Sequence, residues 1–144
     1  MPAVAITDTG NLFGALEFSQ ACTAKGVQPI IGCQVNLTRP ENPRLAPDPV
    51  VVLAQNPAGL ANVQRLSSRG FIEADPADPQ LPLDALLDHA EGLILLTGGT
   101  LGPVSRLLSE GRRDAAADLL RRAIDKGLDL LGGIGGALRQ FAHL

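Results

Sequence analysis

The residue best placed for chemistry is Asp8, which follows the apolar run Ala3–Ile6 and lies in the polar turn Thr7–Asn11. Such a run is typical of a buried strand, and the turn residues mark its carboxyl end. In α/β proteins the carboxyl ends of parallel strands hold the binding and catalytic groups. Asp8 is therefore a candidate metal ligand, and the structural alternative is a carboxylate that caps the next helix or binds the turn amides.

Other polar or reactive residues have simpler interpretations. Glu17 falls within a predicted helix as a solvated charge, and Cys33 falls in an apolar strand as a buried, inert thiol. The glycine-rich stretch 98–102 lies between a predicted strand and a helix, where anions can bind. It lacks the Gly-Lys-Ser/Thr ending of a phosphate loop, which favours a tight turn. His89 and His143 lie in no motif with metal-ligand spacing.

The composition indicates one globular domain. The chain has 144 residues, of which 45% are hydrophobic and 19% charged, with a net charge of −3. This charge, with no Trp or Tyr, argues against a basic or base-stacking surface for nucleic acid. The two cysteines form no disulfide framework, and no apolar run is long enough to span a bilayer. We expect a cytoplasmic protein with no membrane segment.

The elements that must position Asp8 alternate between strands and helices, which predicts a parallel α/β sheet with crossover helices. Asn11 is predicted to cap the first helix, and Asn56 with Pro57 to begin the second. A proline-rich loop is expected over 36–49. The predicted strands are 2–8, 29–35, 50–54 and 93–97, and the predicted helices are 12–25, 57–70, 81–90, 103–109 and 112–126.

Four separated stretches, in this order, closely resemble one known family: MPAVAITDTGNLFGALEF, GVQPIIGCQV, VVVLAQNPAGLANVQRLSS and EGLILLTGG. They resemble the PHP (polymerase and histidinol phosphatase) domain of bacterial DNA polymerase III α subunits. The resemblance implies a distorted β/α barrel with a metal cluster at the carboxyl ends of its strands. It covers about residues 1–127, so we expect an incomplete PHP domain there and a Gly-rich tail over 128–144.

The resemblance assigns the family's metal ligands to particular positions of this sequence. Asp8 occupies the place of a family Asp, but Thr9 replaces the His that follows it. Gln34 replaces a family Glu, Pro49 a His, and Gly99 a Cys or His. The family's opening H-x-H motif would lie before residue 1.

The substitutions remove most of the charge that would hold cations. Catalytic metal clusters need several anionic or imidazole ligands that converge on one point. We therefore expect Asp8 as a vestigial ligand, Gln34 as a degenerate ligand position, no catalytic residue and no cofactor. Family members use a divalent metal, Zn, Mn or Mg. The alternative is a residual metal-dependent phosphoesterase or 3′→5′ exonuclease that uses Asp8, Glu17 and Gln34.

The resemblance also implies partners. Inert family members support the polymerase core and contact the proofreading exonuclease subunit, so we expect this chain to be associated with DNA only indirectly. The chain begins at a methionine that the family has internally, and 128–144 does not resemble the next family strand. We therefore expect a fragment, which is a truncated gene product, the product of a frameshifted reading frame or a piece made for expression. An incomplete barrel leaves open sheet edges, which makes a stand-alone interaction module that self-associates a further alternative.

Overall fold

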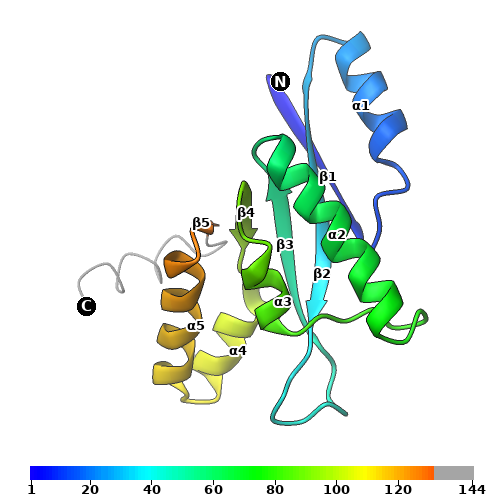
Figure 1. Ribbon diagram of the computed structural model, residues 1–144. Coiled ribbons are helices and arrows are strands. Elements are labelled where there is room, and N and C mark those ends of the chain that lie inside the picture. Colours follow the sequence, from blue (N-terminus) through cyan, green and yellow to red (C-terminus); the bar gives the residue numbers. More distant parts are fainter. Residues whose placement is uncertain (132–144) are drawn as a thin grey trace.

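The computed structural model describes residues 1–131 of the chain. Its centre is one sheet in which the strands lie side by side in chain order (Figure 1). Among the described residues the sheet is open, with the first and last strands as its edges. The strands are β1 (Ala3–Thr9), β2 (Gln28–Leu37), β3 (Asp48–Ala54), β4 (Leu93–Leu96) and β5 (Asp129–Leu131).

One strand runs against the others. β1 pairs parallel with β2, and β4 with β5, whereas β3 is antiparallel to both of its neighbours. The mixed α/β class is confirmed, but the prediction of a parallel strand over 50–54 is wrong. The reason is the connection: only residues 38–47 join β2 to β3, whereas a parallel neighbour needs a crossover of about a dozen residues or more.

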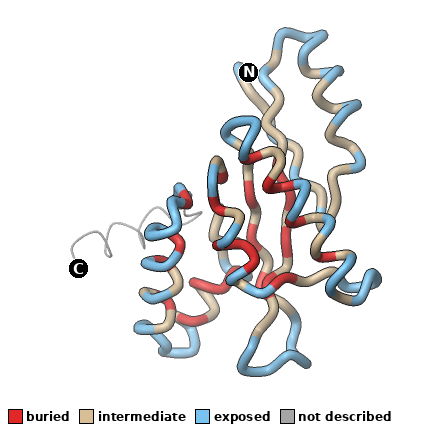
Figure 2. Tube along the Cα trace, in the orientation of Figure 1, coloured by how far each residue is buried: buried red, intermediate tan, exposed pale blue. Residues whose placement is uncertain are grey.

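The helices form a second layer on one face of the sheet, as Figure 1 shows for α2 and α3. The core consists of alternate residues of the central strands, such as Cys33 and Val52, packed against Leu66 of α2 and Leu86 of α3. Figure 2 shows these buried positions where strands and helices meet. The helices are α1 (Ala15–Ala24), α2 (Pro57–Glu73), α3 (Leu83–Asp88), α4 (Pro103–Ser109) and α5 (Arg113–Asp125), with a 3₁₀ turn η1 (Gly99–Leu101).

The opposite face of the sheet, here called the open face, contributes no side chain to this core cluster of described residues. Strand register places one residue from each central strand in rows across it. These side chains are half-buried and mostly apolar: Ile30, Gln34, Val51, Leu53, Ile94 and Leu96. The protein is thus a two-layer structure with one sheet face left bare by the described helices.

Local signals predicted one helix start correctly and missed another. α2 begins at Pro57, and Asn56 Oδ1 accepts a hydrogen bond from Gly59 N at 2.9 Å, which confirms the predicted cap. α1 begins later than predicted, because Asn11 Oδ1 accepts from Phe13 N and closes a turn instead. No residue of α1 is buried.

The sequence after α5 also differs from expectation. A short strand, β5, forms at Asp129–Leu131 and pairs with β4, inside the tail that was not expected to supply a strand. The remainder of the predicted tail, 132–144, lies outside the described residues. Within the described residues, no helix has the length and apolar character needed to cross a membrane.

Candidate functional site

The two predicted metal positions lie on neighbouring strands but on opposite faces of the sheet. Asp8 of β1 is in register with Cys33 of β2, and Thr9 is in register with Gln34. Register partners share a face and successive residues alternate. Asp8 therefore faces the helical layer together with the buried Cys33, while Gln34 points to the open face.

Asp8 lies against the loop that begins α1. A Cβ atom built on Gly14, the residue that caps α1, would lie 3.2 Å from Asp8 Oδ2. A carboxylate at this point lies near the positive end of a helix and is stabilised there. Burial raises the pKa of the Cys33 thiol to about 11, and the charge of Asp8 adds to that rise. The thiol is thus protonated at neutral pH, as expected for an inert core cysteine.

Three of the substituted ligand positions meet in one cavity. Gln34, Pro49 and Gly99 line a hollow of about 380 Å³ on the open face. It lies at the carboxyl ends of β2, β4 and β5, where ligands bind in α/β sheets. The other lining residues are Val50, Val51, Leu96, Thr97, Gly98, Leu101 and Leu131.

A glycine turn forms one wall of this cavity. Gly98 has a φ of 80°, a left-handed value that a side chain disfavours. A Cβ atom on Gly98 would lie 2.0 Å from the carbonyl oxygen of Pro49, so only glycine allows β4 to turn this close to β3. The glycine-rich stretch 98–102 forms a tight turn that contains η1, as one of its two interpretations predicted.

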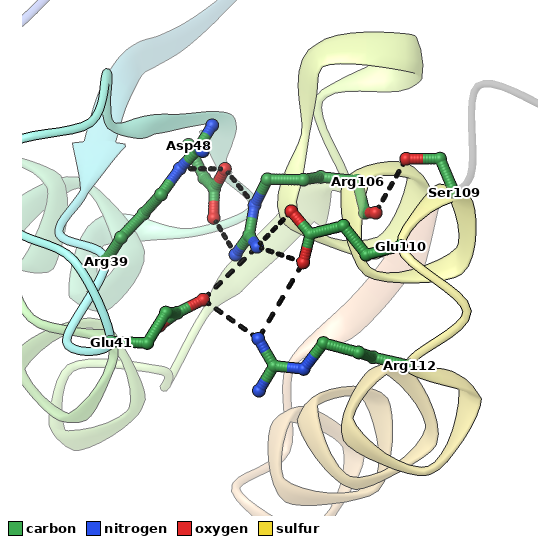
Figure 3. A network of polar contacts seen from close by, with 7 residues as sticks. All are labelled: Arg39, Glu41, Asp48, Arg106, Ser109, Glu110 and Arg112. Carbon is green, nitrogen blue, oxygen red and sulfur yellow. Dashed lines mark hydrogen bonds and ion pairs between the residues drawn. The ribbon is translucent and has the colours of Figure 1, made fainter.

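A network of charges fixes the β3 wall of the cavity (Figure 3). The Asp48 side chain, only 4% exposed, directly precedes Pro49. Arg106 of α4 donates to it from Nε at 2.8 Å and from Nη2 at 2.7 Å. Arg39 of the β2–β3 loop donates from Nε at 3.1 Å. Two guanidinium groups thus neutralise one buried carboxylate and tie α4 to the start of β3.

The network extends to the surface through Glu41. Glu41 Oε1 accepts from Arg106 Nη1 at 3.2 Å and from Arg112 Nη1 at 3.1 Å. Its own backbone N–H, then these guanidinium groups, hold the pKa of Glu41 below the usual 4.5. The hydrogen bond to Asp48 raises the pKa of Arg106 further above its usual range. Glu110 also pairs with Arg106, at 3.1 Å.

The residues present do not fit a divalent metal cluster. On the open face the substituted positions offer a carboxamide, a hydroxyl, an imino acid and a glycine, and none of these is an anion or an imidazole. Asp8 is on the other face, and Glu17 is exposed on α1. Residues 1–131 contain no group of three or more His, Cys, Asp or Glu side chains arranged to hold a metal.

Sequence reasoning missed the residues that build this region. Asp48 falls in the proline-rich loop predicted over 36–49, although an acid this close to the apolar run VVVLA is buried only when it is paired. Arg106, its main partner, is 58 residues away and follows no local rule. His89 caps α3, and its Nδ1 lies 2.8 Å from Ala85 O, while His143 lies outside the described residues.

Comparison with known proteins agrees with the resemblance seen in the sequence. A profile of the PHP domain matches residues 1–132. The chain is 42% identical over 125 residues to DNA polymerase III subunit alpha of Caulobacter vibrioides, an alignment that covers 83% of this chain and 11% of the relative. It is 35% identical over 127 residues to the Treponema pallidum protein of that name, covering 83% and 11%.

A third relative gives the same result. DNA polymerase III subunit alpha of Thermus aquaticus is 36% identical over 123 residues, which covers 80% of this chain and 10% of the relative. The chain therefore spans only about a tenth of the length of the relatives it matches. The profile matches the whole described chain, and together with these relatives it shows that the protein belongs to the PHP domain family.

Proposed function

We propose that this chain is a non-catalytic scaffold of the PHP type, without phosphoesterase activity. The observation that supports the proposal most is the placement of Asp8 and Gln34 on opposite faces of the sheet. A metal that activates water needs its ligands around one point. Within residues 1–131 the Asp8 carboxylate belongs to no group of three or more potential metal ligands, and the described residues that line the cavity on the other face are neutral.

As a scaffold, the chain would support a polymerase core and contact a proofreading exonuclease subunit. Support for this comes from the names of the relatives, which are DNA polymerase III α subunits. These partners, the replicative context and the indirect relation to DNA are all parts of the proposal. The rigid Asp48 network supports a structural role, since it fixes the β2–β3 loop and α4 as one unit.

A phosphoesterase assay tests the proposal against its enzymatic alternative. The pure chain is incubated with Mn²⁺ or Zn²⁺ and an activated phosphodiester, beside an Asp8→Ala variant. We expect the same background hydrolysis in both samples. Metal-dependent turnover that disappears in Asp8→Ala would establish the residual phosphoesterase instead. Pull-down of the exonuclease subunit by the chain tests the scaffold's partner independently.

A second function, self-association as an interaction module, is supported by the β1 side of the molecule. β1 is a seven-residue strand whose only described sheet partner is β2. Phe13 and Leu16, in the connection and the helix that follow β1, are 87% and 71% exposed. An edge strand next to exposed apolar side chains is a pairing surface for another chain.

A further inference from the structure

The cavity on the open face is better suited to a neutral ligand than to a charged one. In the part of the chain that the structure describes, ten residues line it, and all ten are uncharged. A phosphate or a metal ion placed here would meet no opposite charge from these residues, and an uncompensated charge is costly in an apolar hollow. The lining therefore favours a neutral ligand. The volume of about 380 Å³ is in the range of small-molecule sites, which are mostly apolar with a few polar groups.

The polar group that would orient such a ligand is the Gln34 carboxamide. It has a carbonyl acceptor and an NH₂ donor side by side in one plane. The complement of this edge is a lactam or amidine edge, in which an N–H lies beside an acceptor, as in a nucleobase. The backbone of Gln34 is held in place, since its carbonyl accepts from Gly10 N at 2.8 Å. The carboxamide is thus presented from a fixed strand position.

The other walls suit a flat ligand. Val51 of β3 and Leu96 of β4 lie in the same cross-strand row as Gln34, and Pro49 lies in the neighbouring row, so all three bring apolar surface beside the carboxamide. Thr97 adds a hydroxyl at the end of β4. Gly98 and Gly99 leave the turn without side chains, and Gly99 has nothing within 4 Å of where its Cβ would be. The hollow is open to a ring that enters from the sheet face.

The geometry points to a binding site for an uncharged planar heterocycle with a lactam edge, paired to the Gln34 carboxamide and packed against Pro49, Val51 and Leu96. Uracil is the simplest probe of this class. The inference rests on the proposed function in one respect, because it takes the cavity as free of metal. Under this inference Gln34 and Pro49, which the resemblance aligns with metal ligands, recognise a neutral ring.

The test is a titration of the chain with uracil, followed by NMR of the methyl groups of Val51, Leu96 and Leu131. We expect saturable shifts at these methyl groups and none at methyl groups outside the cavity lining. 1,3-Dimethyluracil has the same ring but no N–H donor, so its binding should be at least about tenfold weaker. Inorganic phosphate, which has charge but no ring, should cause no shift at these methyl groups.

Two variants make the test specific. Gln34→Leu removes the carboxamide and should weaken uracil binding at least about tenfold. Gln28→Leu makes the same exchange on the same strand, away from the cavity, and should bind like the parent chain. Thermal melts of both variants show whether either exchange disturbs the fold.

Three results would overturn the inference: no saturable shift with uracil, equal binding of dimethyluracil, or unchanged binding in a folded Gln34→Leu variant. If Gln34→Leu does not fold, the comparison of uracil with dimethyluracil on the parent chain decides the question alone. Failure of the proposed function is recognised separately, because metal-dependent turnover is measured without uracil and depends on Asp8.

Discussion

At the scale of single residues, Asp48 stands out as the one buried charged residue of the described chain. Its side chain is nearly fully buried between Arg39 and Arg106, and the Arg106 side chain is itself only 14% exposed. A buried carboxylate is tolerated because both guanidinium groups donate to it. Removing either side of such a pair leaves a buried charge without compensation.

We predict that Asp48→Ala lowers the free energy of unfolding by about 3–5 kcal/mol, because it removes the buried carboxylate from Arg39 and Arg106 and leaves Arg106 only its exposed partners Glu41 and Glu110. Chemical denaturation of the parent and the variant measures this difference. The control is Arg69→Ala, which breaks an exposed pair with Glu73 on α2 and should cost less than about 1 kcal/mol. Equal effects of the two substitutions would show that burial of Asp48 does not matter.

A second residue-scale prediction concerns Glu41 and pH. The pKa of Glu41 is below 4.5 in the folded protein, so folding favours its charged form. Its contribution to stability is complete above pH 4.5 and is lost as pH falls through the lowered folded value. The effect is small, because the side chain is 37% exposed and solvent screens its pairs.

The measurement is the melting temperature as a function of pH for the parent chain and for Glu41→Gln. The two curves should be separated above pH 4.5 and converge below it. Curves that remain parallel through this range would mean that Glu41 makes no charge-dependent contribution to the fold.

At the scale of elements, β1 and α1 are the least buried part of the described fold. α1 has no buried residue, and β1 contacts β2 as its only strand neighbour among the described residues. Central strands such as β2 and β3 are buried on the helical face by α2 and α3. Regions with little apolar burial open first and are available to other chains. This explains why an interaction through β1 is the second candidate function.

We predict that the 144-residue chain self-associates through β1, and that Ala5→Lys shifts it toward the monomer. Ala5 is exposed on the edge strand, and a lysine there discourages pairing with another strand. Light scattering after size exclusion measures the mass. Ala21→Lys adds the same charge on exposed α1 and should leave the mass unchanged. A monodisperse parent monomer of 15.0 kDa would contradict this prediction.

At the scale of the whole molecule, the sequence predicted the elements better than their arrangement. The Asn56–Pro57 cap and the apolar run at β3 follow from local chemistry, and both helix and strand are confirmed. The direction of β3 and the bare open face do not follow from local chemistry. They depend on the path that the connections between strands take across the sheet. The predicted strands are apolar on both sides, so they do not reveal which face the helices leave bare.

The candidate site was likewise predictable in its residues but not in its arrangement. The family positions Gln34, Pro49 and Gly99 could be named from the resemblance, and the structure brings them to one cavity. That Asp8 faces the other side follows only from the register of β1 with β2. The Asp48 network joins residues 58 positions apart in the chain, which is a property of the fold and not of any motif.

The central claim is that the neutral residues Gln34, Pro49 and Gly99, which the resemblance aligns with metal ligands, cannot hold a divalent metal. Calorimetric titration of the metal-free chain with Mn²⁺ and with Zn²⁺ tests this claim most directly. The account predicts no saturable, stoichiometric binding of either ion at neutral pH. Tight binding of one or more equivalents of either ion would contradict it.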